Sequence, residues 1–318
     1  MKELAGTSAL IRLILRRDRI PLPIWILWLT IVPIFTAASF AELYPTAVER
    51  QAFADTVGSN PALVVLYGPL FDSSVGGLTA WRMGIVPVFV ALFSLLTVIR
   101  HTRTEEEAGR RELLGATVVG RHAPLAAALI VTVAANLVLA ALLALGMIIQ
   151  DLPAAGAISF GLAFATAGCV FAAVAAVVAQ LTEGAGAARG IAISILGLAF
   201  LLRAAGDIGG DDSGWSWLSW ASPIGWAQQV RPFADERWWV FALAVGAFVV
   251  LAAAAYALSS RRDVGSGLLA PRPGPATASP YLRSPLALAW RLHRGLLLGW
   301  TAVFFVMGAV FGSITEAA

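Results

Sequence analysis

Several stretches of about twenty residues in this sequence are almost entirely apolar, and they constrain the fold more than any other feature. A helix of roughly twenty apolar residues spans the hydrocarbon core of a bilayer. Hydrophobic residues occupy 59% of the 318 positions and charged residues only 13%. Because lipid offers the backbone no hydrogen-bond partners, helices are the expected spanning structure. The sequence therefore predicts an all-α polytopic membrane protein.

Seven spans are expected along the chain. Each is an apolar run bounded by charged residues or by proline and glycine. The expected ranges are 21–40, 78–99, 124–149, 154–181, 190–202, 238–258 and 296–314.

The basic residues indicate the orientation of these spans. If the N-terminus is cytoplasmic, 17 of the 22 lysine and arginine residues face the cytoplasm. The positive-inside rule favours this orientation over its inverse. The basic residues form no patch with interleaved aromatics, which counts against a nucleic-acid partner.

An amphipathic helix is expected ahead of the first span. In the sequence TSALIRLILRRDRIPLP, residues 7–23, leucine and isoleucine share one side of a helix and arginine the other. Pro21 and Pro23 are expected to end it. It would lie along the inner membrane surface, and the alternative is a basic flank that only orients the first span. The residues assigned to this surface helix are Arg12, Arg16, Arg17 and Arg19.

The stretch RTEEEAGRRELLGATVVGR, residues 103–121, gathers glutamates and arginines between two apolar runs. On a helix, Glu106 would precede Arg110 and Glu107 would precede Arg111 by four residues, which is the stabilising order. Thr104 lies at capping-box distance from Glu107. We therefore expect a helix over residues 104–117 that begins at Thr104.

This expected helix has a small apolar face and an acidic head. Leu113, Leu114 and Val118 make the face, while residues 105–107 are expected to stay solvated. Anionic lipids would repel three successive glutamates, so the helix should project toward a cytoplasmic protein. The alternative is a solvated loop whose charges merely keep it out of the membrane.

The segment between the fifth and sixth spans is rich in tryptophan. Six tryptophans lie within residues 206–239, interrupted by glycine, serine and proline. Tryptophan favours the membrane interface, so short re-entrant or surface-lying helices are expected there. A plain aromatic belt is the alternative. Residues 41–77 are expected to form a short external helix and a return to the membrane.

The charged stretch resembles the coupling helix of ABC exporter permeases of the antibiotic and polyketide-efflux kind. Its matching positions are Glu106, Glu107, Gly109, Arg110, Glu112, Leu113 and Arg121. The segment SWASPIGWAQQVRPFADERWW, residues 219–239, also resembles an external segment of that family, although here it precedes the sixth span. The resemblance covers residues 1 to about 260. It implies a six-span half that binds a separate ATPase through Glu105, Glu106, Glu107, Arg110, Arg111, Glu112, Leu113 and Leu114.

A second, incomplete half is expected after a linker. Residues 260–283 are rich in proline, glycine and serine, as cytoplasmic linkers are. Residues 284–318 echo the surface helix and first span when shifted by 275 positions, with Arg16 matching Arg291 and Trp25 matching Trp300. Chance likeness between apolar segments is the alternative. The predicted organisation is a permease half at 1–259, a linker, and the start of a second repeat.

The sequence carries no reactive motif of its own. A P-loop needs a lysine after its glycines, and the single lysine, Lys2, lies outside any such loop. No H-E-x-x-H or G-x-S-x-G motif occurs, so an enzyme is not expected. We expect no cofactor on this chain, with ATP and Mg²⁺ bound by the partner.

The expected function is the transmembrane subunit of an ATP-driven exporter of hydrophobic or amphipathic molecules in a bacterial plasma membrane. Expected partners are an ABC ATPase dimer, lipid, the cargo and a second permease half. Asn136 and Thr166 could contact cargo, although hydrogen bonding between helices is the commoner role of such residues. The rivals are a carrier driven by an ion gradient, disfavoured because no mid-membrane carboxylate is expected, and a truncated scaffold that transports nothing.

Overall fold

The computed structural model describes residues 2–58, 60–109, 119–209, 214–263, 265–269, 277, 282 and 284–316. Across these ranges the ordered elements are all helices, and none is a strand. Six helices are long and apolar enough to cross a bilayer, which confirms the all-α polytopic prediction. They are α2 (Pro21–Leu43), α6 with α7 (Val86–His101 and Arg103–Glu107), α9 (Ala123–Ile149), α10 (Ala154–Leu181), α11 (Ala185–Ile208) and α14 (Val240–Ser260).

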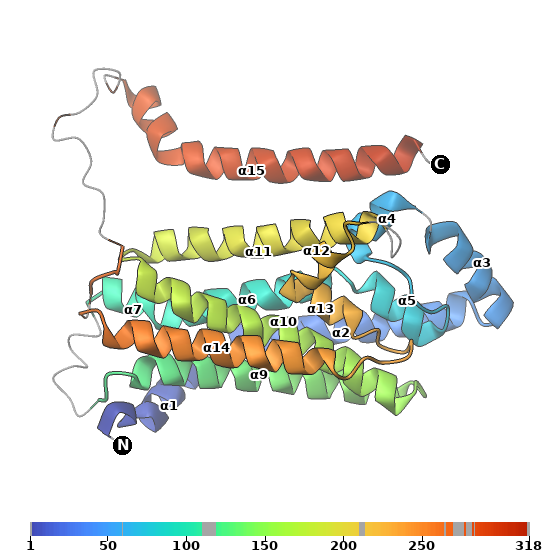
Figure 1. Ribbon diagram of the computed structural model, residues 1–318, viewed down its shortest axis with the longest axis horizontal. Helices are drawn as coiled ribbons and strands as arrows, with labels where there is room; N and C mark the ends of the chain where they lie inside the picture. Colours follow the sequence, from blue (N-terminus) through green and yellow to red (C-terminus); the bar gives the residue numbers. More distant parts are fainter. Residues whose placement is uncertain are drawn as a thin grey trace.

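Short helices cover the two ends of this bundle (Figure 1). One end, which we call the α7 end, carries α7 and the N-terminal helices. The other, the α4 end, carries the helices that join α2 to α6 and α11 to α14. At the α7 end lie η1 (Lys2–Leu4) and α1 (Thr7–Arg17), and at the α4 end α3 (Ala47–Gly58), α4 (Pro61–Tyr67), α5 (Val75–Arg82), α12 (Trp217–Trp220) and α13 (Pro223–Gln229).

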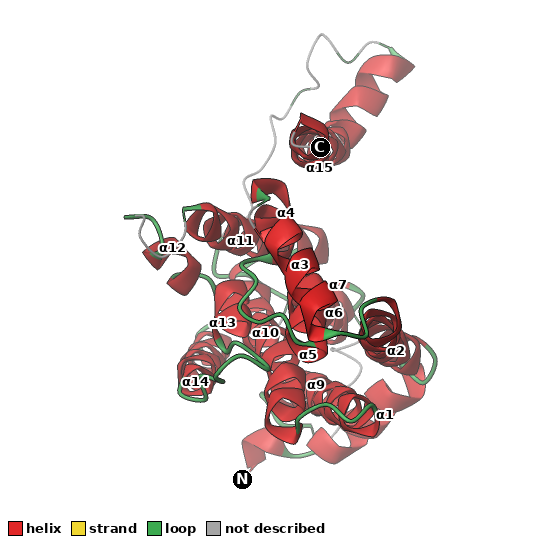
Figure 2. Ribbon diagram, turned by 90° about the vertical axis from the view of Figure 1, so that its right-hand side faces the viewer, coloured by secondary structure: helices red, strands yellow, loops and turns green. Residues whose placement is uncertain are grey.

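Helix α10 is the centre of the bundle. It packs against α6, α9, α11, α13 and α14, and the end-on view places it among them (Figure 2). In its most apolar window 72% of the residues are buried, against 17% for α14. Exposed Phe35, Val249 and Val250 lie on the outer helices, where large apolar side chains suit contact with lipid.

Small residues allow α9 and α10 to approach each other closely. A Cβ added at Gly161 would lie 2.3 Å from the carbonyl oxygen of Ala140. A Cβ added at Gly168 would lie 2.1 Å from Oδ1 of Asn136. Packing of small residues replaces the hydrophobic effect as the main attraction between helices in lipid.

The second span begins later than residue 78, at Val86, because the chain breaks before α6. Helix α5 ends at Arg82, and α6 begins at Val86. Between them, a Cβ at Gly84 would lie 1.8 Å from the carbonyl oxygen of Tyr67, so the turn presses against the end of α4. The apolar run alone gave no sign of this tertiary contact.

The fifth span is longer than residues 190–202, because charged residues that seemed to bound it lie within α11. The side chain of Arg203 is fully buried. Its guanidinium donates to the carbonyl oxygen of Val65 at 2.7 Å and pairs with Asp207 at 3.4 Å. Carbonyls in the last turn of a helix lack partners within it, so Arg203 satisfies the end of α4.

The amphipathic helix ahead of the first span is confirmed as α1. Leu10 and Ile14 are buried in a cluster with Ala123, Ala127 and Val131 of α9. Its end differs from the prediction, since α1 stops at Arg17 and Pro21 opens α2. Proline is tolerated in the first turn of a helix, where its missing N–H has no partner to lose.

The segments that join α2 to α6 and α11 to α14 also form helices. Residues 41–77 hold α3, α4 and the start of α5, where one short helix was expected. The tryptophan-rich segment forms α12 and α13, as predicted. Ala227 and Val230, in and just after α13, are buried in a cluster with Ala163 of α10.

The C-terminal helix α15 (Pro285–Glu316) differs from the predicted surface helix and separate span. It is one helix that lies beside the bundle and contacts it at α4 (Figure 1). The proposed repeat accounts for this continuity. Leu296 and Leu298 stand where Pro21 and Pro23 stand in the first copy, so no proline interrupts the second.

Gly161→Ala tests the close approach of α9 and α10. The added methyl group would press on backbone, so the two helices must separate, at a cost of about 1–3 kcal/mol. Gly197→Ala in α11 is the control, because nothing lies within 4 Å of its Cβ position. We expect thermal unfolding in detergent to begin at a lower temperature for Gly161→Ala alone. Equal unfolding temperatures would contradict this packing.

Candidate functional site: the charged network at the α7 end

The first part of the predicted coupling helix forms α7 (Arg103–Glu107), which starts one residue earlier than expected. It begins at Arg103, directly after α6, and Thr104 does not cap it. It ends at Glu107, and Gly109 follows with a φ of +69°. Glycine takes this left-handed conformation readily, and it commonly ends helices. Helix α7 is therefore a short extension of the second span.

Part of the predicted coupling site lies outside the described residues. Residues 110–118, with Arg110, Arg111, Glu112, Leu113 and Leu114, belong to this part. The described chain reaches Gly109 on one side and resumes at Val119 on the other. The structure therefore defines the residues on either side of this segment, which we call its base.

The three glutamates of α7 bind the chain itself. The expectation that they stay solvated is wrong for Glu106, which is buried, whereas Glu105 is half-buried and Glu107 is exposed. Glu105 pairs with Arg17 of α1 at 2.9 Å. The carboxylate of Glu107 accepts the backbone N–H of Ala185 at 2.9 Å, at the start of α11. A carboxylate there also meets the positive end of the helix dipole.

Glu106 is the most enclosed of the three. One carboxylate oxygen accepts from Arg103, and the other accepts from Arg262 at 2.9 Å. Its side chain is 1% exposed, and those of Arg103 and Arg262 are 0% and 5% exposed. Buried charges need such partners, because an unpaired one costs several kcal/mol.

Arg262 belongs to a segment that we call the strap, residues 261–263 and 265–269, which follows α14. Its guanidinium also donates to Oε1 of Gln180 at 2.8 Å and to the carbonyl oxygen of Ser266 at 3.0 Å. Burial lowers the pKa of Arg262 from its usual value. Arginine starts from so high a value that it keeps its charge at neutral pH.

The far side of residues 110–118 is anchored as well. Arg121 donates to the carbonyl oxygen of Ser259, in the last turn of α14, at 2.9 Å and to that of Arg262, in the strap, at 2.6 Å. Gly120 N–H donates to the carbonyl oxygen of Ala5 at 2.9 Å. Both ends of the segment are thus bonded to the bundle.

Asp18 completes what we call the charged network. Following α1, it pairs with Arg100 at 3.0 Å and with His101, both from the last turn of α6. The network joins α1, α6, α7, α10, α11, α14 and the strap. Its charged and titratable members are Arg17, Asp18, Arg100, His101, Arg103, Glu105, Glu106, Glu107, Arg121 and Arg262.

Of the four arginines assigned to the surface helix, the structure brings Arg17 into the network. Arg12 and Arg16 are exposed on α1. Arg19 is exposed between α1 and α2. The amphipathic pattern correctly separated this polar side from the buried Leu10 and Ile14, whereas Leu13 of the predicted apolar face is 43% exposed.

Asn136 and Thr166 lie among helices and not along a described pocket. The amide nitrogen of Asn136 donates to Oγ of Ser94 at 3.0 Å and to the carbonyl oxygen of Thr132 at 2.9 Å. Thr166 donates to the carbonyl oxygen of Leu162 at 2.7 Å. The bond between α9 and α6 gives Asn136 the role of joining helices.

Sequence reasoning missed Arg262 and Gln180 as members of the site. Arg262 falls in the predicted linker, and Gln180 ends an apolar span. The spacing of Arg103 and Glu106 on a helix was a usable signal for their pairing. No local pattern indicated that a residue 156 positions away would share Glu106.

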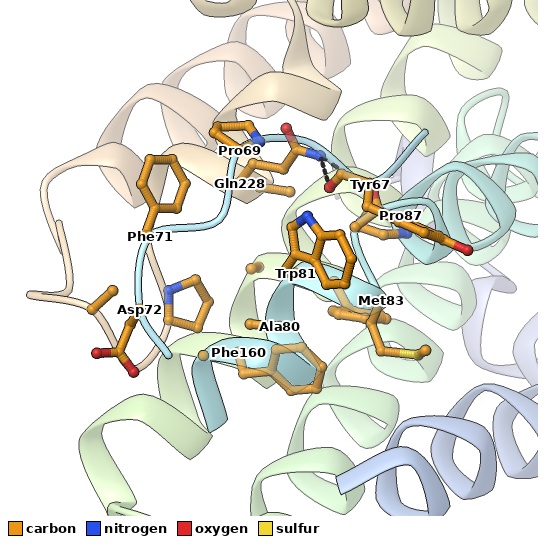
Figure 3. Close-up of a pocket in the computed structure, with 17 residues that line it drawn as sticks. Tyr67, Pro69, Phe71, Asp72, Ala80, Trp81, Met83, Pro87, Phe160 and Gln228 are labelled. Atoms are coloured by element: carbon orange, nitrogen blue, oxygen red, sulfur yellow. Dashed lines mark hydrogen bonds between the residues drawn. The ribbon is translucent and has the colours of Figure 1, made fainter. Parts of the chain in front are cut away.

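A second feature, an aromatic pocket, lies at the α4 end. Its interior leaves about 40 Å³ open to water-sized molecules. Phe71, Trp81 and Phe160 are among the rings that line it, and Asp72 lies at one side (Figure 3). Gln228 of α13 donates to the carbonyl oxygen of Tyr67 at 2.9 Å, so the pocket joins α4, α5, α10 and α13.

Glu106→Ala tests the charged network. Two buried guanidinium groups would lose their shared carboxylate, which should destabilise the protein by about 3–5 kcal/mol. Glu42→Ala, at an exposed position, is the matched control and should have little effect. The measurement is the midpoint of denaturant unfolding in detergent. Equal midpoints for the two variants would refute the role assigned to Glu106.

Comparison with known proteins agrees with this architecture. The family described as multidrug efflux system permease Rv1217c, C-terminal domain, matches residues 11–258 and 282–318. The multidrug efflux system permease protein Rv1217c of Mycobacterium tuberculosis (strain H37Rv) is 48% identical over 313 residues. The alignment covers 98% of this chain and 56% of that relative, so the chain spans little more than half the relative's length. The chain belongs to this family of multidrug efflux system permeases.

Proposed function

We propose that this chain is the transmembrane subunit of an ATP-driven exporter, with residues 110–118 as the docking segment for a separate ATPase. The α7 end would face the cytoplasm of a bacterium. The excess of basic residues around α1, α7 and the strap supports that orientation. ATP and Mg²⁺ would bind to the partner, an ATPase dimer, since the sequence has no P-loop.

The observation that carries the proposal is the anchoring of both ends of the docking segment. On one side Glu106 and Glu107 bind the strap and α11, and on the other Arg121 binds the end of α14. The residues that anchor the segment are closely packed, and closely packed protein resists compression. A displacement of the docking segment would therefore pass to the helices that hold it. Movement of a docked ATPase would therefore tilt several spans together.

The contacts of the glutamates change which residues should touch the ATPase. Since Glu105, Glu106 and Glu107 bind their own chain, their role becomes holding the base. Arg110, Arg111 and Glu112 would supply the polar contacts. Leu113 and Leu114 would fill an apolar groove, as buried anchors do in other interfaces.

The cargo would be hydrophobic or amphipathic small molecules. The printed name of the Mycobacterium tuberculosis relative describes multidrug efflux, and that chain is 48% identical to this one. A second permease half would complete the path.

An energy-source experiment separates this proposal from an ion-gradient carrier. Cells that express the protein with its cognate ATPase would be loaded with a fluorescent amphipathic drug. We expect export to stop when ATP is depleted and to continue when the proton gradient is collapsed with ATP maintained. The reverse result would indicate a secondary carrier. Absence of export in both conditions would favour a scaffold that does not transport.

Replacing Leu113 and Leu114 together with aspartate tests the docking segment. The charges would oppose burial in the ATPase groove, so ATP-dependent export should fall at least about tenfold. Val48→Asp is the control, because this apolar residue is 79% exposed on α3 at the opposite end. Membrane content of each variant would be matched by immunoblot. Normal export by the double variant would rule out docking through these leucines.

A further inference from the structure

The strap falls at the start of the predicted linker, residues 260–283, but its contacts join it to the bundle. Leu268 N–H donates to the carbonyl oxygen of Gln180 at 3.2 Å, and Leu269 N–H donates to that of Leu181 at 2.9 Å. Both acceptors lie in the last turn of α10, where carbonyls have no partner within the helix. The strap therefore caps the central helix.

A glycine fits the strap tightly against the turn between α10 and α11. A Cβ added at Gly267 would lie 2.6 Å from the carbonyl carbon of Thr182 and 2.8 Å from the nitrogen of Glu183. The atoms it would meet belong to the backbone and cannot rotate away. A side chain at this position would force the strap off the turn.

The strap also holds α7. The carbonyl oxygen of Ser266 accepts from Arg103 at 2.9 Å and from Arg262 at 3.0 Å. Glu106 joins the same two arginines from α7. A helix of five residues has little stability of its own, because nucleation of a helix is unfavourable. Tertiary contacts of this kind must hold α7 in place.

We propose that the strap is the mechanical link between the docking segment and the central helix, with Arg262 as its positioning residue. This inference rests on the proposed function. Movement of residues 110–118 would reach α7, pass through Glu106 to Arg262, and continue to α10 through Gln180 and the capped carbonyls. Because the strap leads toward α15, it would also carry that movement to the next part of the chain.

Gly267→Val tests the link without altering a charge. The control is Gly184→Ala, at the start of α11, since its Cβ would meet nothing within 4 Å. The readout is the amount of drug exported per ATP hydrolysed. We expect Gly267→Val to lower this ratio about tenfold while membrane content and ATPase binding stay unchanged. The control should retain the normal ratio.

Two substitutions at Arg262 distinguish the effect of its charge, which holds Glu106, from the effect of its side-chain volume. Arg262→Met keeps the length of the side chain and removes the charge, whereas Arg262→Lys keeps a charge that can reach Glu106. We expect the lysine variant to recover part of the coupling that the methionine variant loses. Equal ratios for the two variants would overturn the role of Arg262.

Amide hydrogen exchange provides a readout that does not depend on transport. In the wild-type protein, the N–H groups of Leu268 and Leu269 should be protected. In Gly267→Val and Arg262→Met they should exchange at least about tenfold faster, since displacement of the strap would break the hydrogen bonds of these amides to the end of α10. Unprotected amides in the wild type would overturn the proposal.

The outcomes distinguish this inference from the proposed function. If the wild-type protein exports nothing with ATP, the proposed function fails whatever the strap does. The strap inference alone fails under a different set of results. In that case ATP hydrolysis drives export in the wild type and not in the Leu113 and Leu114 double variant. Gly267→Val then exports normally although its strap amides are exposed.

Discussion

The shared carboxylate of Glu106 is the interaction on which the α7 end of this protein depends. It lies between two guanidinium groups, one from α7 itself and one from a segment 156 positions later in the chain. A buried ion pair contributes little net stability, yet removing one member is costly. The main effect of the Glu106 carboxylate is therefore to fix the position of α7 relative to the strap, and its net contribution to stability is small. Here it fixes a single turn of helix against the end of the bundle.

Other polar side chains buried in this apolar bundle also have specific partners. Arg203 lies within a span, but it satisfies carbonyls at the end of α4 and pairs with Asp207. Asn136 likewise joins α9 to α6. Both side chains enter the bundle where another backbone or side-chain group accepts from them. As a result, the two ends of the bundle are held by polar contacts, and small residues pack its centre.

Features with a local physical cause could be predicted from the sequence. The fourth span has the predicted bounds, because an unbroken apolar run needs no partner to define it. The amphipathic period before Pro21 correctly identified α1 and its buried face. The fifth span was predicted too short, since a charge beside an apolar run looks like a boundary until its partner is known. For the same reason residues 105–107 were expected to be solvated, and Gln180 and Arg262 were not recognised.

The sequence by itself determined that this is a helical membrane protein with basic segments gathered on one side and a charged stretch between two spans. These properties follow from hydropathy and helical period, which are local. Only the tertiary structure decided that the glutamates bind their own chain, that the supposed linker begins as a strap, and that both ends of residues 110–118 are anchored. These depend on charges that meet after folding, and the desolvation of a charge cannot be judged until its surroundings are in place.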